Sequence, residues 1–471
     1  MKLTLMEVLA ACGGTLLIQG EEQLLTRLTT DSRTACPGSL FVPVIGENLD
    51  GHRFLGSAIE NGASCVLASE EAAAAGCMEK ARENGTSVIL VEDTVKALQQ
   101  VGKAARSKVS ALTIGVTGSV GKTTTREMIA CALSAGKNVF RTGANYNNRL
   151  GVPLTLSEIP EDVQIAVLEL GLNTPGELSE ISSLTDLSCA VITNIGEAHL
   201  QYYGTQDNLT REKFTVTDGF TDPEKDPVLV LNADDPYLMK YKDEYPYRKI
   251  LYGRSENADY RAKELRQEYG NYSFLLNVKG EDLFRVQLSV PGEHNVLNAL
   301  AALACADLFS VPLEDAAKAL ETYAGFKGRL KQTEKNGILI VDDSYNASPD
   351  SMKAGIKVLS ELHFEEGKGR KFAVLGDMLE LGDESPRFHY ETGAAIADLP
   401  VDAFLLTGTL AEEIGHGLSE NGREDAVERF SDREALLFKL KECVKPGDIV
   451  YVKASHSAGL SWIVEALLSD E

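Results

Sequence analysis

Residues 111–136, ALTIGVTGSVGKTTTREMIACALSAG, decide the fold of the chain. An apolar run at 111–116 leads into a glycine-rich turn, and an alanine-containing stretch then continues to Gly136. This order predicts a buried strand, a loop and a helix. Glycines let the backbone N–H groups of such a loop turn towards phosphate oxygens, and the helix N-terminus behind the loop attracts negative charge. The stretch therefore predicts a nucleotide-binding loop at the start of a parallel α/β sheet.

The glycine loop has the spacing G-x-x-G-x-x-G-K-T-T. It departs from the strict G-x-x-x-x-G-K-[ST] pattern because Val116 stands where the first glycine of that pattern would lie. We expect Lys122 to reach the β- and γ-phosphates and the Thr123 hydroxyl to bind Mg²⁺. The alternative is a tight strand–helix turn without a ligand. The apolar run before the loop, the helix after it and the Lys-Thr-Thr sequence favour the phosphate loop.

Three more apolar runs, at 165–171, 189–196 and 227–235, each end in a turn that carries polar residues. Continuous apolar strands that alternate with helices predict a parallel sheet covered on both faces, with ligands bound at the carboxyl ends of the strands. Glu169 closes the first run and His199 follows the second. Both are candidate Mg²⁺ ligands. Their alternatives are a capping or surface carboxylate and a structural histidine.

The remaining sequence predicts two further α/β units, one over residues 1–106 and one near the C-terminus, with apolar strands expected at 337–344, 371–378, 403–408 and 448–455. Residues 1–106 alternate short apolar strands with alanine-rich helices, and a polar stretch at 103–110 links them to the phosphate-loop unit. Residues 251–290 have alternating strands and turns that predict a small antiparallel appendage. We therefore expect three domains, with these boundaries: 1–106, 107–326 and 327–471.

The composition narrows the classes of function. The chain has 471 residues with 46 Lys+Arg and 70 Asp+Glu, a formal net charge of −24. This acidity argues against non-specific nucleic-acid binding and against adhesion to an anionic membrane, although a local positive pocket can still bind an anion. No apolar run approaches the roughly 18–20 residues that span a bilayer. We expect no nucleic-acid partner and no membrane insertion.

The cysteines and the first residues indicate a cytoplasmic protein. The 8 cysteines include no C-x-x-C pair, which favours reduced, buried thiols. Residues 9–12, Leu-Ala-Ala-Cys, resemble a lipoprotein cleavage site, but Glu7 interrupts the apolar stretch before them. We favour an amphipathic first helix that ends at Gly13-Gly14.

Several motifs in order resemble the Mur ligases and their relative folylpolyglutamate synthetase over essentially the whole chain. Beside the phosphate loop these motifs are TDSRTACPGSLFVPVIGENLDGH (30–52), NYNNRLGVPLTL (145–156), TNIGEAHLQYYGT (193–205), PGEHNVLNALAA (291–302), DDSYNASPDSM (342–352) and VLGDMLELG (374–382). The resemblance implies three domains, with a central P-loop ATPase domain and a Rossmann-like C-terminal domain. It also implies an ATP-dependent, ADP-forming carboxylate–amine ligase of peptidoglycan synthesis, and hence of cell-wall biogenesis, cell shape and cell division.

The last two motifs resemble those of the member that joins D-alanyl-D-alanine to UDP-N-acetylmuramoyl-tripeptide through an acyl phosphate. The sequence has no Asp-Asn-Pro-Arg stretch, typical of the ligase that adds the third residue, and no Asp-Gly-Ala-His-Asn-Pro stretch, typical of folylpolyglutamate synthetase. Those two enzymes remain the alternative ligases, and a catalytically inactive nucleotide-binding scaffold is the alternative of another class. The implied partners are UDP-N-acetylmuramoyl-tripeptide, whose third residue is diaminopimelate or lysine, and D-alanyl-D-alanine. We expect the protein itself to be a monomer.

The resemblance also implies residue roles. It assigns ATP contacts to Thr117, Gly118, Ser119, Val120, Gly121, Lys122, Thr123, Thr124, Asn295, Arg329, Asp343 and Asn346. It assigns substrate contacts to Ser32, Arg33, Asn147, Asn148, Tyr345, Ser348, Lys453 and Ser455, with the first two at the UDP end. The implied catalytic residues are Lys122, Glu169, His199 and Lys213, and the implied Mg²⁺ ligands are Thr123, Glu169, His199 and Lys213.

Two positions in this scheme carry alternatives. The resemblance implies a carbamate on Lys213, which would turn a cation into an anionic metal ligand; the alternative is a solvated lysine on a helix. Many relatives have arginine where this chain has His456. Arginine is always charged and forks onto a carboxylate or phosphate, whereas histidine is shorter and titrates near neutral pH, so the role of His456 in holding substrate is open.

Overall fold

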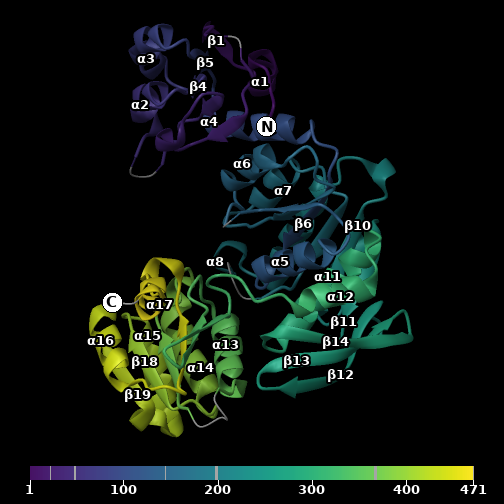
Figure 1. The fold of residues 1–471 in the computed structure, drawn as a ribbon, viewed down its shortest axis with the longest axis vertical. Coiled ribbons are helices and arrows are strands. Elements are labelled where there is room, and N and C mark those ends of the chain that lie inside the picture. The colour runs from purple at the N-terminus through teal and green to yellow at the C-terminus, as the bar shows by residue number, and fades with distance from the viewer. Residues whose placement is uncertain (22, 47–48, 144, 197–199, 365–368, 470–471) are drawn as a thin grey trace. The chain divides into compact units, whose positions relative to one another are not determined.

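The computed structural model describes the chain except residues 22, 47–48, 144, 197–199, 365–368 and 470–471. The described residues form sheets of five, nine and six strands, which Figure 1 labels in chain order. They divide into two compact units. The first comprises Met1–Thr117, Lys137–Val191 and Glu212–Leu229, and the second comprises Gly118–Gly136, Ile192–Arg211 and Val230–Glu471.

The first unit begins with a five-stranded sheet in the order β1-β5-β4-β3-β2, in which β1 is antiparallel to β5 and the other pairs are parallel. Successive strand residues alternate between two cores: Leu40 faces one core and Phe41 the other. Helix α1 ends at Gly13, whose φ of 63° is left-handed, as the sequence predicts. The elements are α1 (Leu5–Cys12), β1 (Thr15–Ile18), β2 (Arg27–Thr29), β3 (Ser39–Phe41), α2 (Leu55–Glu60), β4 (Cys65–Ala68), α3 (Glu71–Glu83), β5 (Ser87–Leu90) and α4 (Thr94–Arg106).

The nine-stranded sheet has the order β14-β13-β12-β11-β10-β9-β6-β8-β7. Its strands β6, β8 and β7 are parallel and belong to the first unit. The buried strands are almost continuously apolar, as expected for a sheet covered on both faces. Their bounds and those of the nearby helices are β6 (Leu112–Thr117), β7 (Val139–Arg141), α6 (Gly151–Glu158), β8 (Ile165–Glu169), α7 (Glu177–Ser182), β9 (Cys189–Ile192), α9 (Gln206–Phe214) and β10 (Val228–Asn232).

The antiparallel segment expected at 251–290 is present as β12, β13 and β14. Because β11 pairs with β12 in parallel, these strands extend the central sheet rather than forming a separate appendage. In the second unit, α5 of the phosphate loop packs against α11 and α12. The elements are α5 (Lys122–Leu133), α8 (Leu200–Tyr203), α10 (Pro236–Tyr241), β11 (Arg248–Gly253), β12 (Tyr260–Glu268), β13 (Asn271–Val278), β14 (Glu281–Pro291), α11 (His294–Leu308) and α12 (Leu313–Glu321).

The C-terminal sheet has the order β15-β16-β20-β17-β18-β19, with β15 antiparallel to β16 and the other pairs parallel. Helices α13, α14 and α15 pack on one face and α16 and α17 on the other (Figure 1). The elements are β15 (Lys331–Lys335), β16 (Ile338–Asp342), α13 (Pro349–Glu361), β17 (Lys371–Leu375), α14 (Ser385–Ile396), β18 (Ala403–Thr407), α15 (Ala411–Leu418), β19 (Val427–Phe430), α16 (Arg433–Cys443), β20 (Ile449–Lys453) and α17 (Ser461–Leu468). The predicted α/β class with parallel-rich sheets is confirmed.

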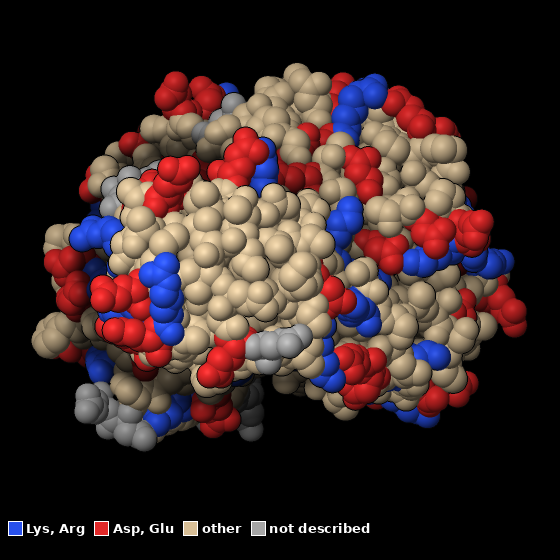
Figure 2. Space-filling view, turned by 90° about the horizontal axis from the view of Figure 1, so that it is seen from above, with Lys and Arg blue, Asp and Glu red and all other residues tan. Residues whose placement is uncertain are grey.

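The structure bears on two features of the composition, the distribution of charge and the length of apolar segments. On the face drawn in Figure 2, Lys and Arg side chains are scattered among Asp and Glu side chains. No helix among the described residues is both long enough and apolar enough to cross a membrane.

Candidate active site

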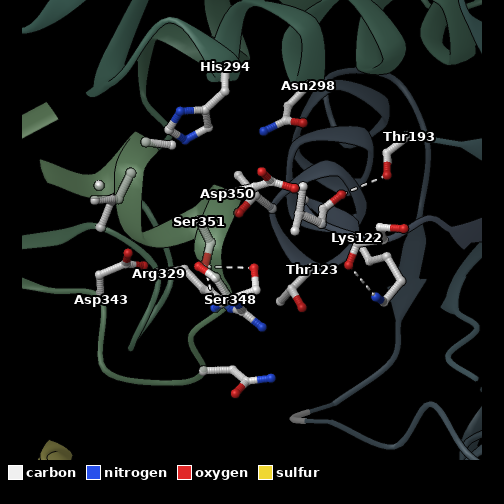
Figure 3. A pocket seen from close by; sticks show the side chains of 18 of the residues that line it. Lys122, Thr123, Thr193, His294, Asn298, Arg329, Asp343, Ser348, Asp350 and Ser351 are labelled. Carbon is white, nitrogen blue, oxygen red and sulfur yellow. Dashed lines mark hydrogen bonds between the residues drawn. The ribbon is translucent and has the colours of Figure 1, made fainter. Parts of the chain in front are cut away.

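A cavity of about 360 Å³ lies within the second unit. Its wall combines the phosphate loop with the first turns of α11 and α13 and the carboxyl ends of β16 and β20 (Figure 3). The cavity brings together most of the residues expected to contact ATP and two of those expected to contact substrate. These are Ser119, Val120, Gly121, Lys122, Thr123, Thr124, Asn295, Arg329, Asp343 and Asn346, with Ser348 and Lys453.

The phosphate loop depends on glycine at two positions. Gly118 has a φ of 148° and Gly121 a φ of 81°, and a Cβ atom on Gly118 would lie 1.9 Å from Oγ1 of Thr193. Thr193 donates from Oγ1 to the carbonyl oxygen of Val120 at 2.7 Å (Figure 3). The Asn194 side chain accepts from the Val120 N–H at 3.0 Å. Thr193 and Asn194, which follow β9, thus fix the shape of the phosphate loop through bonds to Val120.

The Lys122 ammonium lies over the same loop. Its Nζ donates to the carbonyl oxygens of Gly118 at 2.9 Å and Ser119 at 3.3 Å. Figure 3 shows Lys122 beside Thr123 in the cavity wall. Thr123 follows in the first turn of α5 and is buried. A cation, a hydroxyl and the N-terminus of a helix therefore face one small region, the combination that binds a polyphosphate.

A chain of side-chain amides joins α11 to α5. Asn295 donates from Nδ2 to the Pro291 carbonyl oxygen at 2.7 Å, and its Oδ1 accepts from Asn298 at 2.9 Å. Asn298 in turn accepts from the Thr125 hydroxyl at 2.9 Å. This chain holds Asn295 in the cavity wall. Beside it, desolvation lowers the pKa of His294, so its ring is the neutral form at pH 7.

The C-terminal domain contributes a buried ion pair. Lys453 donates from Nζ to Oδ2 of Asp343 at 2.6 Å, and the Tyr451 hydroxyl donates to the same oxygen at 2.8 Å. Burial lowers the pKa of Lys453, and the Asp343 carboxylate opposes that shift. Burial and the same carboxylate raise the pKa of Tyr451.

Arg329 and Tyr345 meet at the cavity edge. The Arg329 guanidinium lies 4.3 Å from the ring centroid of Tyr345, and its Nε is buried with no hydrogen-bond partner among the described residues. The His456 ring lies 5.7 Å from that of Tyr345, with 38° between the planes. Of the other expected substrate residues, Ser348 caps α13 through Ser351, and Ser455 accepts from the Leu379 N–H at 2.8 Å.

Other predicted site residues lie in the first unit. Glu169 is 3% exposed at the end of β8 and accepts from Nδ2 of Asn147 at 2.7 Å. The Asn148 side chain accepts from the Leu150 and Gly151 N–H groups just before α6. The buried position of Glu169 does not match the surface-carboxylate alternative.

Lys213 is 1% exposed near the end of α9, so it is not the solvated helix lysine of the alternative interpretation. Ser32 is buried, whereas the Arg33 side chain is 87% exposed and makes a two-pronged ion pair with Asp31. That pair lowers the pKa of Asp31 to about 2. Thr117 ends β6 and is buried. His199 lies outside the described residues.

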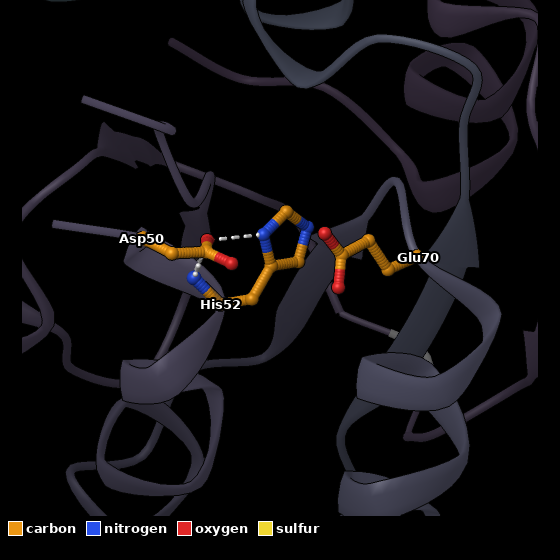
Figure 4. A group of neighbouring side chains, drawn as sticks. All are labelled: Asp50, His52 and Glu70. Carbon is orange, nitrogen blue, oxygen red and sulfur yellow. Dashed lines mark hydrogen bonds and ion pairs between the residues drawn. The ribbon is translucent and has the colours of Figure 1, made fainter. Parts of the chain in front are cut away.

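Asp50, His52 and Glu70 form a group of the metal-binding type among the described residues, with ligand atoms within 4.8 Å of one another (Figure 4). Nδ1 of His52 lies 2.7 Å from Asp50, and Nε2 accepts from the Ser69 N–H at 3.0 Å. Both ring nitrogens are thus used, with the proton on Nδ1. A metal would need the Nε2 lone pair, which already accepts a backbone hydrogen bond. We therefore interpret this group as a structural one.

Sequence reasoning missed part of the cavity wall. Thr193, Asn194, His294, Asn298 and Ser351 all line the cavity. Asn298 had a local signal, because it stands three residues after Asn295 and therefore on the same helix face. Thr193 and Asn194 begin the motif at residues 193–205, but only the fold shows that they support the phosphate loop.

Three family models match the chain in succession. They are the Mur ligase family catalytic domain at residues 25–106, the Mur ligase middle domain at 116–306 and the Mur ligase glutamate ligase domain at 328–456. A UDP-N-acetylmuramoyl-tripeptide–D-alanyl-D-alanine ligase of Bacillus subtilis is 38% identical over 96% of this chain and 94% of its own. The enzyme of that name from Escherichia coli is 32% identical over 96% and 95%.

The chain belongs to the Mur ligase family. This Mur ligase is an ATP-dependent, ADP-forming enzyme with the three-domain architecture of its family. A crystal structure of MurF from Acinetobacter baumannii superposes with a TM-score of 0.86 at 30% identity over 99% of both chains. The MurF ligase of Thermotoga maritima in complex with ADP superposes with a TM-score of 0.78 at 29% identity over 94% of this chain and 97% of that one.

Proposed function

We propose that this Mur ligase joins the amino group of D-alanyl-D-alanine to the terminal carboxylate of UDP-N-acetylmuramoyl-tripeptide. The product is the UDP-linked pentapeptide precursor of peptidoglycan. The observation that carries the proposal is that relatives with this activity in their names match at least 94% of both chains. The phosphate-loop cavity supplies the nucleotide site that such a reaction needs.

The chemistry explains why a phosphate loop serves an amide-forming enzyme. A carboxylate is a poor electrophile, so its oxygen first attacks the γ-phosphorus of ATP, and ADP leaves. The dipeptide amine then attacks the acyl phosphate, and the tetrahedral intermediate expels phosphate as the amine loses its proton. Neither step needs a covalent protein nucleophile, so the protein contributes mainly positioning and charge stabilisation.

The residues of the cavity suit the ATP half of the reaction. The left-handed backbone at Gly118 and Gly121 lets N–H groups approach phosphates where a side chain would not fit. Lys122 offsets charge on the transferring phosphoryl group, and Asn295 lies beside adenine in our proposal. ATP contacts from Arg329, Asp343 and Asn346 complete the set.

We assign Mg²⁺ to Thr123, Glu169, His199 and a carbamate on Lys213. When bound, the metal would neutralise phosphate charge. The chemistry of the donors fits this ion: Glu169 is a buried carboxylate, and a carbamate on Lys213, which is also buried, would be an oxygen ligand. Such a carbamate forms when the lysine amine combines with CO₂.

The substrate assignments rest on the family motifs. We place the UDP end at Ser32 and Arg33 and the peptide part near Asn147, Asn148, Tyr345, Ser348 and Ser455. We keep 1–106, 107–326 and 327–471 as the domain boundaries, and we expect a cytoplasmic monomer that binds no nucleic acid.

ADP release is the direct test. The purified chain is assayed with ATP, Mg²⁺ and UDP-N-acetylmuramoyl-tripeptide ending in either diaminopimelate or lysine. D-alanyl-D-alanine, diaminopimelate, lysine and glutamate are offered in turn as the amine. We expect release only with D-alanyl-D-alanine. Release with another amine would indicate a different ligase, and nucleotide binding without turnover would indicate an inactive scaffold.

A further inference from the structure

All three hydrogen bonds of the Lys453 ammonium go to residues 343–346. Besides Oδ2 of Asp343 at 2.6 Å, Nζ contacts the Asp343 carbonyl oxygen at 3.4 Å and the Asn346 carbonyl oxygen at 3.0 Å. A lysine has three N–H donors, and these three acceptors match them. Although Lys453 lines the cavity, it is 1% exposed and its N–H donors are already used, so none is left for a direct substrate contact.

The Tyr451 hydroxyl makes the second contact with the Asp343 carboxylate, and a glycine makes room for it. Gly355 of α13 faces this hydroxyl, and a Cβ atom on Gly355 would lie 1.8 Å from it. Tyr451 is fully buried on β20, and the register of the sheet places it opposite Val341 of β16. The Asp343 N–H donates to the Val452 carbonyl oxygen at 3.0 Å, so backbone and side chain are held from the same strand.

Both contacts with the Asp343 carboxylate use Oδ2. Among the described residues, no donor to Oδ1 is present, and Asp343 lines the cavity together with Asn346. The carboxylate is therefore anchored through one oxygen and retains the other as an acceptor. The turn from 343 to 346 is held at its start by Tyr451, Lys453 and the Val452 carbonyl oxygen, and at its end by the contact of Lys453 with the Asn346 carbonyl oxygen.

We infer that Tyr451 and Lys453 are positioning residues, which hold Asp343 and the 343–346 turn in the arrangement that binds the nucleotide. Lys453 then acts on ATP through this turn and does not hold the dipeptide. The inference rests on the proposed ATP contacts of Asp343 and Asn346. It replaces the substrate role that resemblance alone suggests for Lys453.

The test compares nucleotide affinity with dipeptide affinity in the full-length protein. Tyr451→Phe removes only the hydroxyl, and Lys453→Met removes the charge at similar length. We expect each to weaken ADP binding, measured by titration calorimetry, and to raise KM for ATP on the order of tenfold, the loss typical of one hydrogen bond to a charged group. KM for D-alanyl-D-alanine should stay within about twofold, a change too small to reflect a lost polar contact. A rise in the dipeptide KM with unchanged ADP affinity would overturn the inference.

Matched controls separate this effect from general damage to the sheet. Lys371→Met changes a partly buried lysine on the neighbouring strand β17, and Tyr390→Phe removes a tyrosine hydroxyl that bonds Glu420. Neither side chain lines the cavity, so both variants should bind ADP as the unmodified protein does. If Lys453→Met does not fold, Tyr451→Phe remains informative, because it removes the hydroxyl and leaves both partners of the buried ion pair in the chain.

A double-mutant cycle asks whether Tyr451 acts through Asp343. In an Asp343→Ala background, which removes the acceptor, Tyr451→Phe should cost no further ADP affinity beyond about twofold, because the two changes break the same hydrogen bond. Equal losses in both backgrounds would mean that Tyr451 merely supports β20, and the inference would fall. ADP binding does not depend on which amine the enzyme uses. If the ADP affinities of the variants follow this pattern but the protein shows no turnover that depends on D-alanyl-D-alanine, the proposed function is wrong and the inference about Tyr451 and Lys453 stands.

Discussion

Asn147 donates from Nδ2 to Oε1 of Glu169 at 2.7 Å. The Glu169 N–H also donates to Oγ1 of Thr142 at 3.1 Å, and the Gly171 N–H donates to the Asn147 carbonyl oxygen at 2.7 Å. Asn147 therefore bonds both the carboxylate and the turn that follows β8. A side chain that fixes the orientation of a metal ligand tunes metal affinity without touching the metal.

We predict that Glu169→Ala and Asn147→Ala both raise the Mg²⁺ concentration for half-maximal activity. Glu169→Ala removes a proposed ligand, whereas Asn147→Ala removes only one hydrogen bond to that ligand, so the second effect should be the smaller, roughly tenfold. Activity is measured across a Mg²⁺ titration at constant MgATP. Asn138→Ala is the control, because that amide bonds the exposed Asp162 in the same unit. An unchanged Mg²⁺ requirement in both test variants would show that the pair is structural.

The Lys122 ammonium donates to carbonyl oxygens of the phosphate loop and lines the cavity, rather than packing in a hydrophobic core. Lys122→Ala should reduce ADP release on the order of a thousandfold or more, while the thermal unfolding midpoint stays within a few degrees of the original. A steady-state assay and a circular-dichroism melt check the two halves of this statement. Turnover close to that of the unmodified enzyme would refute the phosphate-loop assignment.

The sequence was informative wherever the physical signal is local. The glycine spacing, the apolar run before it and the helix after it lie within residues 111–136, and the loop forms there as predicted. The same holds for the first helix, whose end at Gly13 needs a left-handed residue. Continuous apolar strands were enough to predict a covered parallel sheet, because burial on both faces leaves no polar alternation.

What the sequence could not show depends on contacts between distant residues. Lys453 and Asp343 are separated by 110 positions, and nothing near either residue indicates a buried ion pair. The burial of Lys213 is likewise a tertiary property, since a lysine in the sequence REKF reads equally well as solvated. The parallel pairing of β11 with β12 also escaped prediction, because strand periodicity carries no information about which neighbour a strand will choose.

His389 predicts a pH dependence of stability. Its Nε2 accepts from the Met378 N–H at 2.8 Å and its Nδ1 donates to the Ser385 carbonyl oxygen at 2.6 Å, so the folded protein holds the neutral ring. Burial lowers its pKa, hence the unfolded chain, with a pKa of about 6.5, binds more protons in the window below that value. The neutral His389 ring therefore contributes its full share to the free energy of unfolding above about pH 6.5. That contribution is lost as the pH falls towards the pKa of His389 in the folded protein.

The expected observation is a thermal midpoint that falls between pH 7.5 and pH 5.5, both chosen to bracket a pKa of about 6.5. His389→Gln should be less stable at neutral pH, with a shallower fall. His416→Gln is the control, because His416 is exposed and pairs with Glu413 at the surface. Equal slopes in the unmodified protein and His389→Gln would exclude His389 as the source.

His456 has a contact that a shorter side chain would lose. Its ring packs on Tyr345, whose ring in turn carries the Arg329 guanidinium at 4.3 Å. We predict that His456→Ala lowers kcat/KM for ATP roughly fivefold, in line with about 1 kcal/mol for an aromatic pair, and that His456→Phe retains most of the activity. His363→Ala removes a comparable ring contact with Tyr269 and serves as the control. Equal activity of His456→Ala and the unmodified enzyme would show that the ring contact does not support Arg329.

Lys213 provides the most demanding prediction. The side chain is 1% exposed, and a buried ammonium would repel a metal ion, whereas a carbamate would bind one. If the carbamate is present, Lys213→Ala is nearly inactive, and acetate or formate partly restores activity by placing a carboxylate in the vacated space. Removal of dissolved CO₂ should lower the activity of the unmodified enzyme, and bicarbonate should restore it. Lys240→Ala, which removes an exposed lysine that pairs with Asp207 beside the same helix, is the control and should respond to neither treatment. An active Lys213→Ala variant that is indifferent to short carboxylic acids would mean that Lys213 carries no carbamate, and Mg²⁺ would then depend on the remaining proposed ligands.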